Sequence, residues 1–142
     1  MKISQSLYES IVNEPGDVPP ETGGILGGRE GIVFAHQPDA GMQPARMCSY
    51  VPDTNALNAT VRCWQKEGIV FMGMYHAHFW DVSTLSRGDK NYIEKIMGSM
   101  PAGIERLYFP LIVMPKREIV SYSAQRVLGK VIIDKDDVIV IK

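Results

Sequence analysis

Two histidines stand two residues apart, at His76 and His78, directly after the apolar run 69–75. Residues two apart on an extended chain point to the same face, so the two imidazoles can converge on one metal ion. Zinc binds imidazole nitrogen and carboxylate oxygen at about 2.0–2.2 Å, and a catalytic zinc has three protein ligands and one position open to water. Asp89 is the natural third ligand, because it lies in the first turn of the helix predicted next.

Each of these residues also has an interpretation without chemistry. A histidine pair in a strand is often one buried, hydrogen-bonded imidazole and one solvated imidazole. Ser86 and Asp89 have the spacing of a helix capping box. Glu21 follows two prolines and has the character of an exposed loop carboxylate. His36 has no partner at ligand spacing, so we interpret it as structural.

The apolar periodicity predicts helices interspersed among strands, which indicates an α/β fold in which helices cover a sheet. The predicted helices cover residues 3–13, 54–68 (with Thr54 as N-cap) and 86–98. The predicted strands cover residues 21–28, 31–38, 69–75, 107–115, 118–124 and 138–142. Residues 37–53 are rich in Pro, Gly, Asp and Ser, so we expect an irregular connection there with one short strand at 47–51.

The composition is that of one globular domain, residues 1–142, in which 45% of the residues are hydrophobic. The 15 Lys+Arg against 16 Asp+Glu give a net charge of -1, which argues against binding to nucleic acid or to an anionic membrane. Cys48 and Cys63 fit neither a disulfide framework nor a CxxC motif. We find no secretory signal or membrane span, so we expect a cytoplasmic protein, and the oligomeric state is left open.

The candidate residues together reproduce a known pattern. Glu21 begins the segment ETGGILGG, and HAHFWDVSTLSRGD downstream contains His-x-His, seven residues, Ser, two residues and Asp. The four downstream positions would align by chance in about one chain in several thousand of this length. The sequence thus resembles the JAB/MPN metalloproteases, which carry the JAMM motif, and in particular their small stand-alone prokaryotic members. The resemblance implies a three-layer α-β-α domain with a mixed sheet, like that of the cytidine deaminases.

The resemblance also implies a role for each residue. His76, His78 and Asp89 would hold Zn²⁺, which lowers the pKa of a bound water from about 15.7 to about 7. Glu21 would act as general base, and Ser86 would donate a hydrogen bond to the oxyanion. The reaction would be hydrolysis of a peptide or isopeptide bond. The substrate would be a protein or peptide with a glycine-ended tail, such as a ubiquitin-like or sulfur-carrier β-grasp protein.

Three alternative functions fit the sequence less well. A non-catalytic MPN scaffold that binds protein partners is the main alternative, although such members typically lack motif residues. A zinc deaminase would need a PCxxC segment, which the chain lacks, and a DNA-repair relative does not suit the neutral charge. One departure from the family stands at Phe79, where a proline is common. Phe79 and the following Trp80 are expected to narrow the cleft.

Overall fold

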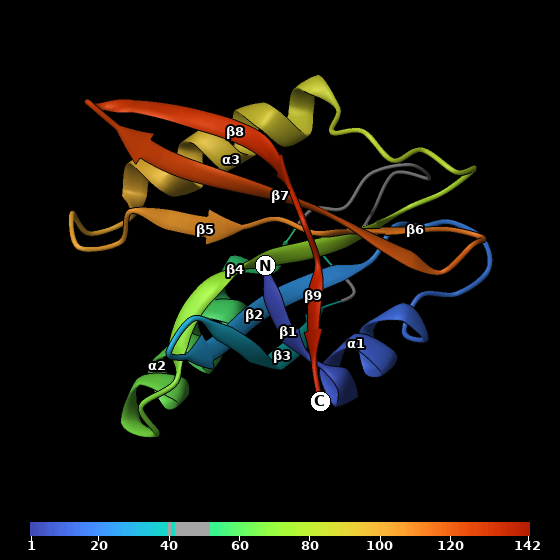
Figure 1. Ribbon diagram of the computed structural model, residues 1–142, viewed down its shortest axis with the longest axis horizontal. Coiled ribbons are helices and arrows are strands. Elements are labelled where there is room, and N and C mark those ends of the chain that lie inside the picture. Colours follow the sequence, from blue (N-terminus) through green and yellow to red (C-terminus); the bar gives the residue numbers. More distant parts are fainter. Residues whose placement is uncertain (40, 42–51) are drawn as a thin grey trace.

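The computed structural model describes residues 1–39, 41 and 52–142 (Figure 1). The helices are α1 (Gln5–Val12), α2 (Thr54–Lys66) and α3 (Arg87–Ser99). The strands are β1 (Lys2–Ser4), β2 (Gly23–Arg29), β3 (Ile32–Asp39), β4 (Val70–His78), β5 (Arg106–Tyr108), β6 (Leu111–Val113), β7 (Glu118–Val127), β8 (Lys130–Asp136) and β9 (Ile139–Ile141). The short strand expected at 47–51 lies outside the described residues. No helix in the described part of the chain is long and apolar enough to cross a membrane.

All nine strands belong to one mixed sheet with the order β5-β7-β6-β4-β2-β3-β1-β9, and β8 pairs with the outer side of β7. β8 and β9 therefore lie at opposite ends of the strand order, yet only Asp137 and Val138 separate them in the chain. A connection this short spans at most about 11 Å between Cα atoms. The sheet must therefore curl until its two ends approach each other, and Figure 1 shows β8 leading directly into β9.

Helices cover both faces of this curved sheet. Leu7 and Ile11 of α1 pack with Leu26 of β2 in one core cluster. The neighbouring residue Ile25 points the other way and packs with Leu57 of α2. The alternation of side chains along a strand thus feeds two separate cores, and α3 joins α2 on the second face through its own cluster. The predicted three-layer α-β-α arrangement with a mixed sheet is confirmed.

The helix boundaries follow from capping. Ser4 caps α1 by accepting a hydrogen bond from the amide of Leu7 at 3.3 Å. For α2 the prediction of Thr54 as N-cap is wrong by one residue, because the Asp53 carboxylate accepts from the amide of Ala56 at 3.3 Å. A carboxylate at this position also interacts favourably with the positive end of the helix dipole.

The strands differ from the predicted ones in several places. β2 begins at Gly23 rather than 21, so Glu21 precedes the strand, and β7 continues past 124 to Val127. The single strand predicted at 107–115 is two strands, β5 and β6, because Pro110 has no amide to donate to a ladder. β1 and β8 were not predicted, since β1 has three residues and β8 is an edge strand with a largely exposed, charged sequence. β4 continues past the predicted end at 75 to His78, so both histidines lie within the ladder.

Gly73 is the position where β4 approaches β5 most closely. Its φ is +148°, and a Cβ there would lie 1.8 Å from the carbonyl oxygen of Tyr108. Only a residue without a side chain fits this contact without moving the backbone. Gly98 in α3 is the opposite case, because no atom lies within 4 Å of its Cβ position.

We therefore expect Gly73→Ala to lower the free energy of unfolding by about 1–3 kcal/mol or more, since the extra methyl overpacks the sheet. Gly98→Ala should be neutral or stabilise by up to about 1 kcal/mol through its helix propensity. Urea unfolding of the two variants beside the wild type measures both. A Gly73→Ala protein as stable as the wild type would contradict the close approach of β4 and β5.

Candidate metal centre

The two histidines lie at the carboxyl end of β4, in the middle of the sheet. β2 runs antiparallel on one side, with Gly23 opposite His76, and β6 runs parallel on the other side, with Val113 opposite His78. Pairing on both sides fixes the backbone that carries the imidazoles. Both rings point to the face covered by α2 and α3, as the two-residue spacing predicts.

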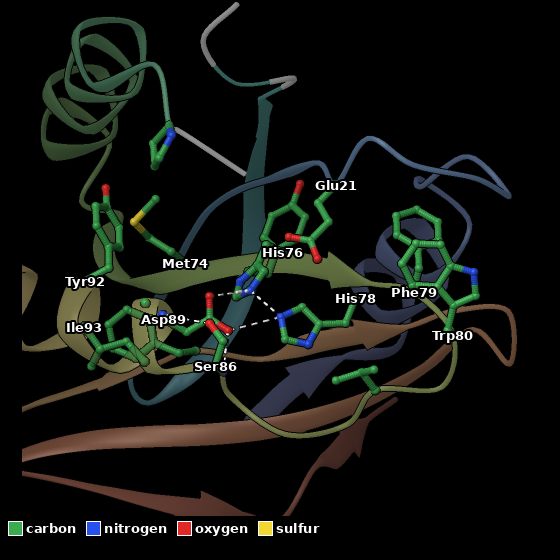
Figure 2. Close-up of a pocket in the computed structure, with 15 residues that line it drawn as sticks. Glu21, Met74, His76, His78, Phe79, Trp80, Ser86, Asp89, Tyr92 and Ile93 are labelled. Carbon is green, nitrogen blue, oxygen red and sulfur yellow. Dashed lines mark hydrogen bonds and ion pairs between the residues drawn. The ribbon is translucent and has the colours of Figure 1, made fainter. Parts of the chain in front are cut away.

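Three side chains converge in front of this strand end (Figure 2). The Nε2 atoms of His76 and His78 lie 2.9 Å apart. The Asp89 carboxylate reaches both rings, with Oδ1 at 3.3 Å from His76 Nε2 and Oδ2 at 3.1 Å from His78 Nε2. Two imidazole nitrogens and a carboxylate therefore face a single point.

Asp89 is held there by the first turn of α3. Its Oδ2 accepts a hydrogen bond from the backbone amide of Ser86 at 2.9 Å, and the Ser86 Oγ accepts from the amide of Asp89 at 3.0 Å. This reciprocal pair is a complete capping box. The capping and ligand interpretations of Asp89 are therefore compatible, because the carboxylate serves the helix and faces the histidines at the same time.

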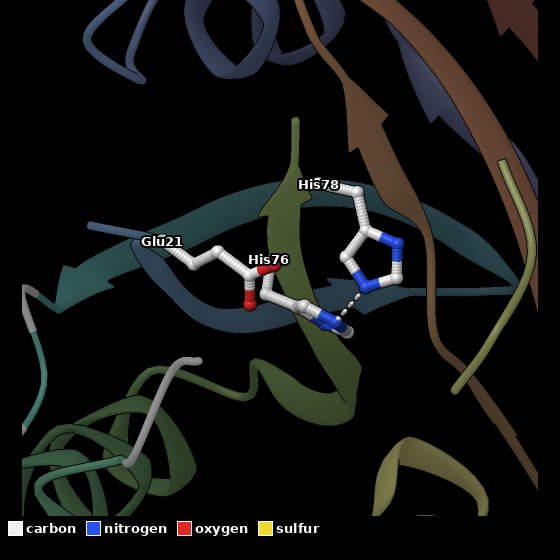
Figure 3. A group of neighbouring side chains, drawn as sticks. All are labelled: Glu21, His76 and His78. Carbon is white, nitrogen blue, oxygen red and sulfur yellow. Dashed lines mark hydrogen bonds between the residues drawn. The ribbon is translucent and has the colours of Figure 1, made fainter. Parts of the chain in front are cut away.

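Glu21 approaches from the loop that precedes β2. Its side chain is half-buried, and one carboxylate oxygen lies with the ring nitrogens of His76 and His78 in a group whose atoms are all within 4.8 Å of one another (Figure 3). The backbone after it is fixed, since the carbonyl of Thr22 accepts from the amide of Ala77 at 2.8 Å. The interpretation of Glu21 as an exposed loop carboxylate is thus wrong.

The charges in the cluster shift one another's protonation. Burial, opposed by the charge of His78 and aided by that of Asp89, raises the pKa of Glu21 to about 7. Burial also opposes ionisation of Asp89, but hydrogen bonds from His76 and His78 outweigh it and hold the pKa of Asp89 well below its usual range. Burial lowers the pKa of His78, but the hydrogen bond and charge of Asp89 raise it above its ordinary value.

The donor set fits a transition-metal ion. Ligand atoms at about 2.0–2.1 Å from a tetrahedral ion must lie about 3.3 Å from one another. The two Nε2 atoms lie 2.9 Å apart, and each lies 3.1–3.3 Å from one of the two Asp89 carboxylate oxygens, so a small expansion would place an ion among these groups. Two neutral imidazoles and one carboxylate are ligands that suit zinc and related ions. Glu21 adds a second carboxylate beside this set.

Ser86 keeps its hydroxyl hydrogen available. Its oxygen acts as an acceptor in the helix cap, which uses a lone pair and leaves the O–H free to donate. The residue is exposed and lines the same cavity as the histidines. A polar group in the cavity can therefore receive a hydrogen bond from Ser86 while the cap remains intact.

A cavity of about 460 Å³ opens over the cluster. Met74 and Tyr92 form part of its wall and were not identified from the sequence. Tyr92 follows Asp89 by three residues on α3. This spacing places both on one helical face, so Tyr92 could have been predicted to line the site. Met74 and Tyr92 also line an apolar groove of about 800 Å³ between α2 and α3, so the cavity and the groove share part of their walls.

Phe79 and Trp80 differ from the expectation that both narrow the cleft. Both line the cavity, and Figure 2 shows their rings on the side of His78 away from Asp89. Phe79 is only 5% exposed and belongs to the core cluster of α1, whereas Trp80 is 65% exposed. Trp80 therefore presents its side chain to solvent at the rim of the cavity, while Phe79 is mainly a core residue.

His36 hydrogen-bonds Glu14 at 3.1 Å, consistent with a structural role.

Comparison with known proteins places the fold. No family model and no curated protein matches the sequence. Among solved structures, the chain is similar to protein DSY2949 from Desulfitobacterium hafniense, with 20% identity, a TM-score of 0.71 and coverage of 99% of this chain and 92% of that one. It is also similar to AF2198, a JAB1/MPN domain protein from Archaeoglobus fulgidus, with 16% identity, a TM-score of 0.58 and 100% coverage of both chains. The chain has the fold of a JAB1/MPN domain.

Metal binding can be tested residue by residue. We expect His76→Ala, His78→Ala and Asp89→Ala each to lower the affinity for Zn²⁺ by more than the roughly 10–100-fold that loss of an outer-shell partner costs, because each removes a ligand. Elemental analysis after dialysis against buffered Zn²⁺ measures the occupancy.

Ser86→Ala is the matched control, since it breaks the same capping box and leaves the three ligands in place. It should lose about 1 kcal/mol of stability, as Asp89→Ala does through the cap, but retain its metal. Full zinc content in a His76→Ala/His78→Ala protein would exclude the site. Wild-type zinc content in Asp89→Ala would show that Asp89 caps α3 but does not bind the metal.

Proposed function

We propose that the protein is a zinc-dependent metallopeptidase of the JAMM type that hydrolyses a peptide or isopeptide bond. The observation that carries the proposal is the convergence of His76, His78 and Asp89 within 2.9–3.3 Å. Glu21 stands beside this cluster, and the whole group lies in an open cavity. The JAB1/MPN fold is compatible with this activity.

In this proposal His76, His78 and Asp89 hold the zinc ion. When bound, the ion supplies Lewis acidity, which lowers the pKa of water to about 7 and polarises a carbonyl. The low pKa of Asp89 keeps it an anion at neutral pH, as a ligand must be. The two histidines serve as neutral donors through Nε2.

Glu21 carries the proton in the proposed reaction. Its carboxylate takes a proton from the attacking water and passes it to the leaving nitrogen. A general base works best with a pKa near the working pH, and burial moves the pKa of Glu21 in that direction, to about 7. The hydroxyl of Ser86 donates to the oxygen on which negative charge develops.

A non-catalytic scaffold on the same fold is less well supported. A scaffold needs none of the five motif side chains, whereas here they surround one cavity. Partial burial of two imidazoles and two carboxylates lowers stability, because each group loses solvation, and a scaffold has no functional need for such a cluster.

We further propose that the substrate is a folded protein of ubiquitin-like or sulfur-carrier β-grasp type with a glycine-ended tail. Tyr92 and Met74 line the cavity on one side of the histidines, and Trp80 lies on the other (Figure 2). An extended chain without Cβ atoms can approach the cavity floor between them most closely. The adjoining apolar groove offers a surface against which a protein substrate can pack.

The acid–base role is tested by Glu21→Gln, which preserves the size of the side chain. We expect zinc content and stability to stay at wild-type levels while kcat falls by at least about 100-fold, because the base is lost. Ser86→Ala should slow hydrolysis by roughly 10²–10³ with zinc retained. Wild-type turnover by Glu21→Gln would exclude Glu21 as the base.

The substrate is tested with a β-grasp protein that carries a Gly-Gly extension followed by a short reporter peptide. We expect cleavage directly after the second glycine, and a fall of at least about 10-fold when both glycines are changed to alanine, since one misplaced ångström costs up to about 10²-fold. Unfolded casein serves as the control for general proteolysis. Equal cleavage of the two tails, or rapid digestion of casein, would contradict tail specificity.

A further inference from the structure

The Glu21 carboxylate must be positioned by its backbone. One of its oxygens lies within 4.8 Å of the ring nitrogens of His76 and His78, and the residue stands in a loop before β2. On the carboxyl side the chain enters β2 at Gly23, which pairs with His76. On the amino side it crosses residues 13–22, which form no helix or strand. The position of the carboxylate therefore depends on what holds this loop.

Arg117 holds the loop from the other side of the active-site strand. It lies in the turn between β6 and β7, and its Nη1 donates to the carbonyl oxygens of Val12 at 2.9 Å and Pro15 at 3.3 Å. Its Nη2 donates to the carboxylate of Asp17 at 2.7 Å. A planar guanidinium can satisfy three acceptors in this way, whereas a lysine ammonium is a point charge without the fork.

The turn that carries Arg117 is itself tied to the metal strand. The amide of Arg117 donates to the carbonyl of Val113 at 2.9 Å, and Val113 is paired with His78. The amide of Met114 donates to the carbonyl of His78 at 2.8 Å. Arg117 thus links the loop of Glu21 to the strand beside the metal ligands over about one hundred residues of sequence.

A second contact fixes the start of the same loop. The hydroxyl of Tyr75 donates to the carboxylate of Glu14 at 2.6 Å, and His36 lies 3.1 Å from the other carboxylate oxygen. Tyr75 immediately precedes His76 and is 1% exposed. The loop is therefore attached to β4 through Glu14 and to the β6–β7 turn through Pro15 and Asp17.

We propose that Arg117 is a positioning residue for the general base, which sets the distance of Glu21 from the metal ligands through the loop 13–22. The inference rests on the proposed function for the role of Glu21. Arg117 does not line the cavity, and its side-chain hydrogen bonds go to Val12, Pro15 and Asp17, so we expect it to act on the reaction through the loop.

Arg117→Asn is the most suitable variant. Arg117 has φ of +57°, a left-handed conformation that asparagine tolerates better than alanine, so the turn is preserved while the fork is lost. We expect zinc content to be unchanged and kcat/KM for the Gly-Gly substrate to fall by about 10–100-fold, mainly in kcat, because the base is displaced while substrate binding remains. Arg117→Lys should recover only part of the loss.

Two matched controls accompany this variant. Lys116→Ala removes the neighbouring exposed cation on the same turn and should leave kcat/KM within about twofold of the wild type. Asp17→Ala breaks only the ion pair to a carboxylate that is 86% exposed, and such pairs contribute little, so its effect should also be small. In a Glu21→Gln background, Arg117→Asn should change the residual rate by less than about twofold, since the group that it positions is already absent.

Amide hydrogen exchange separates this inference from the proposed activity. In Arg117→Asn the amides of residues 16–18 and 21–22 should exchange faster, while those of 74–78 stay protected. Unchanged exchange in the loop overturns the inference even if the protein is an active peptidase. Zinc loss, or an equal further loss of rate in the Glu21→Gln background, also overturns it, because Arg117 would then support the fold in general. If the wild type hydrolyses none of the substrates but the loop amides exchange faster in Arg117→Asn, the anchoring of the loop by Arg117 stands and only the proposed function fails.

Discussion

The site depends on one carboxylate that interacts with two different partners. Asp89 accepts the amide of Ser86 at the start of α3 and faces the ring nitrogens of both histidines at the end of β4. The helix terminus and the strand end are thereby held together by a single side chain. The connection between them is also fixed, because Phe79 and Leu85 are buried and the carbonyl of Ser83 accepts from the hydroxyl of Tyr122 at 2.7 Å. The geometry of the cluster is therefore set by the contacts that join α3 to the end of β4.

The charged groups of this cluster partly offset one another. His76, His78 and the ionised carboxylate of Asp89 share hydrogen bonds. The second carboxylate, Glu21, differs because burial raises its pKa to about 7. A cation placed among these groups would replace the shared protons. Binding of a metal ion at this cluster would therefore release protons.

Much of the site could be predicted because its residues are close in sequence. His76 and His78 share a strand, and Ser86 and Asp89 share a helix turn, so period-two and capping rules place each pair. The helices and most strands followed from the same periodicities. β1 and β8 were missed because one is too short and the other too polar to give a pattern, and the end of β4 was missed because histidines interrupt the apolar run. The link from Arg117 to Pro15 was beyond prediction, since no local rule connects residues so far apart.

The curled sheet also has a consequence for how the chain acquires its structure. β1 is hydrogen-bonded to β9 in parallel, Lys2 opposite Ile139, so strands from the two ends of the sequence are neighbours. Contacts between residues so distant carry a large loop-closure entropy and form slowly compared with helices and hairpins. Hairpins such as β2–β3 and β7–β8 can form early, whereas the pairing of β1 with β9 must wait until β9 has left the ribosome. The closure of the sheet is therefore a late event in folding.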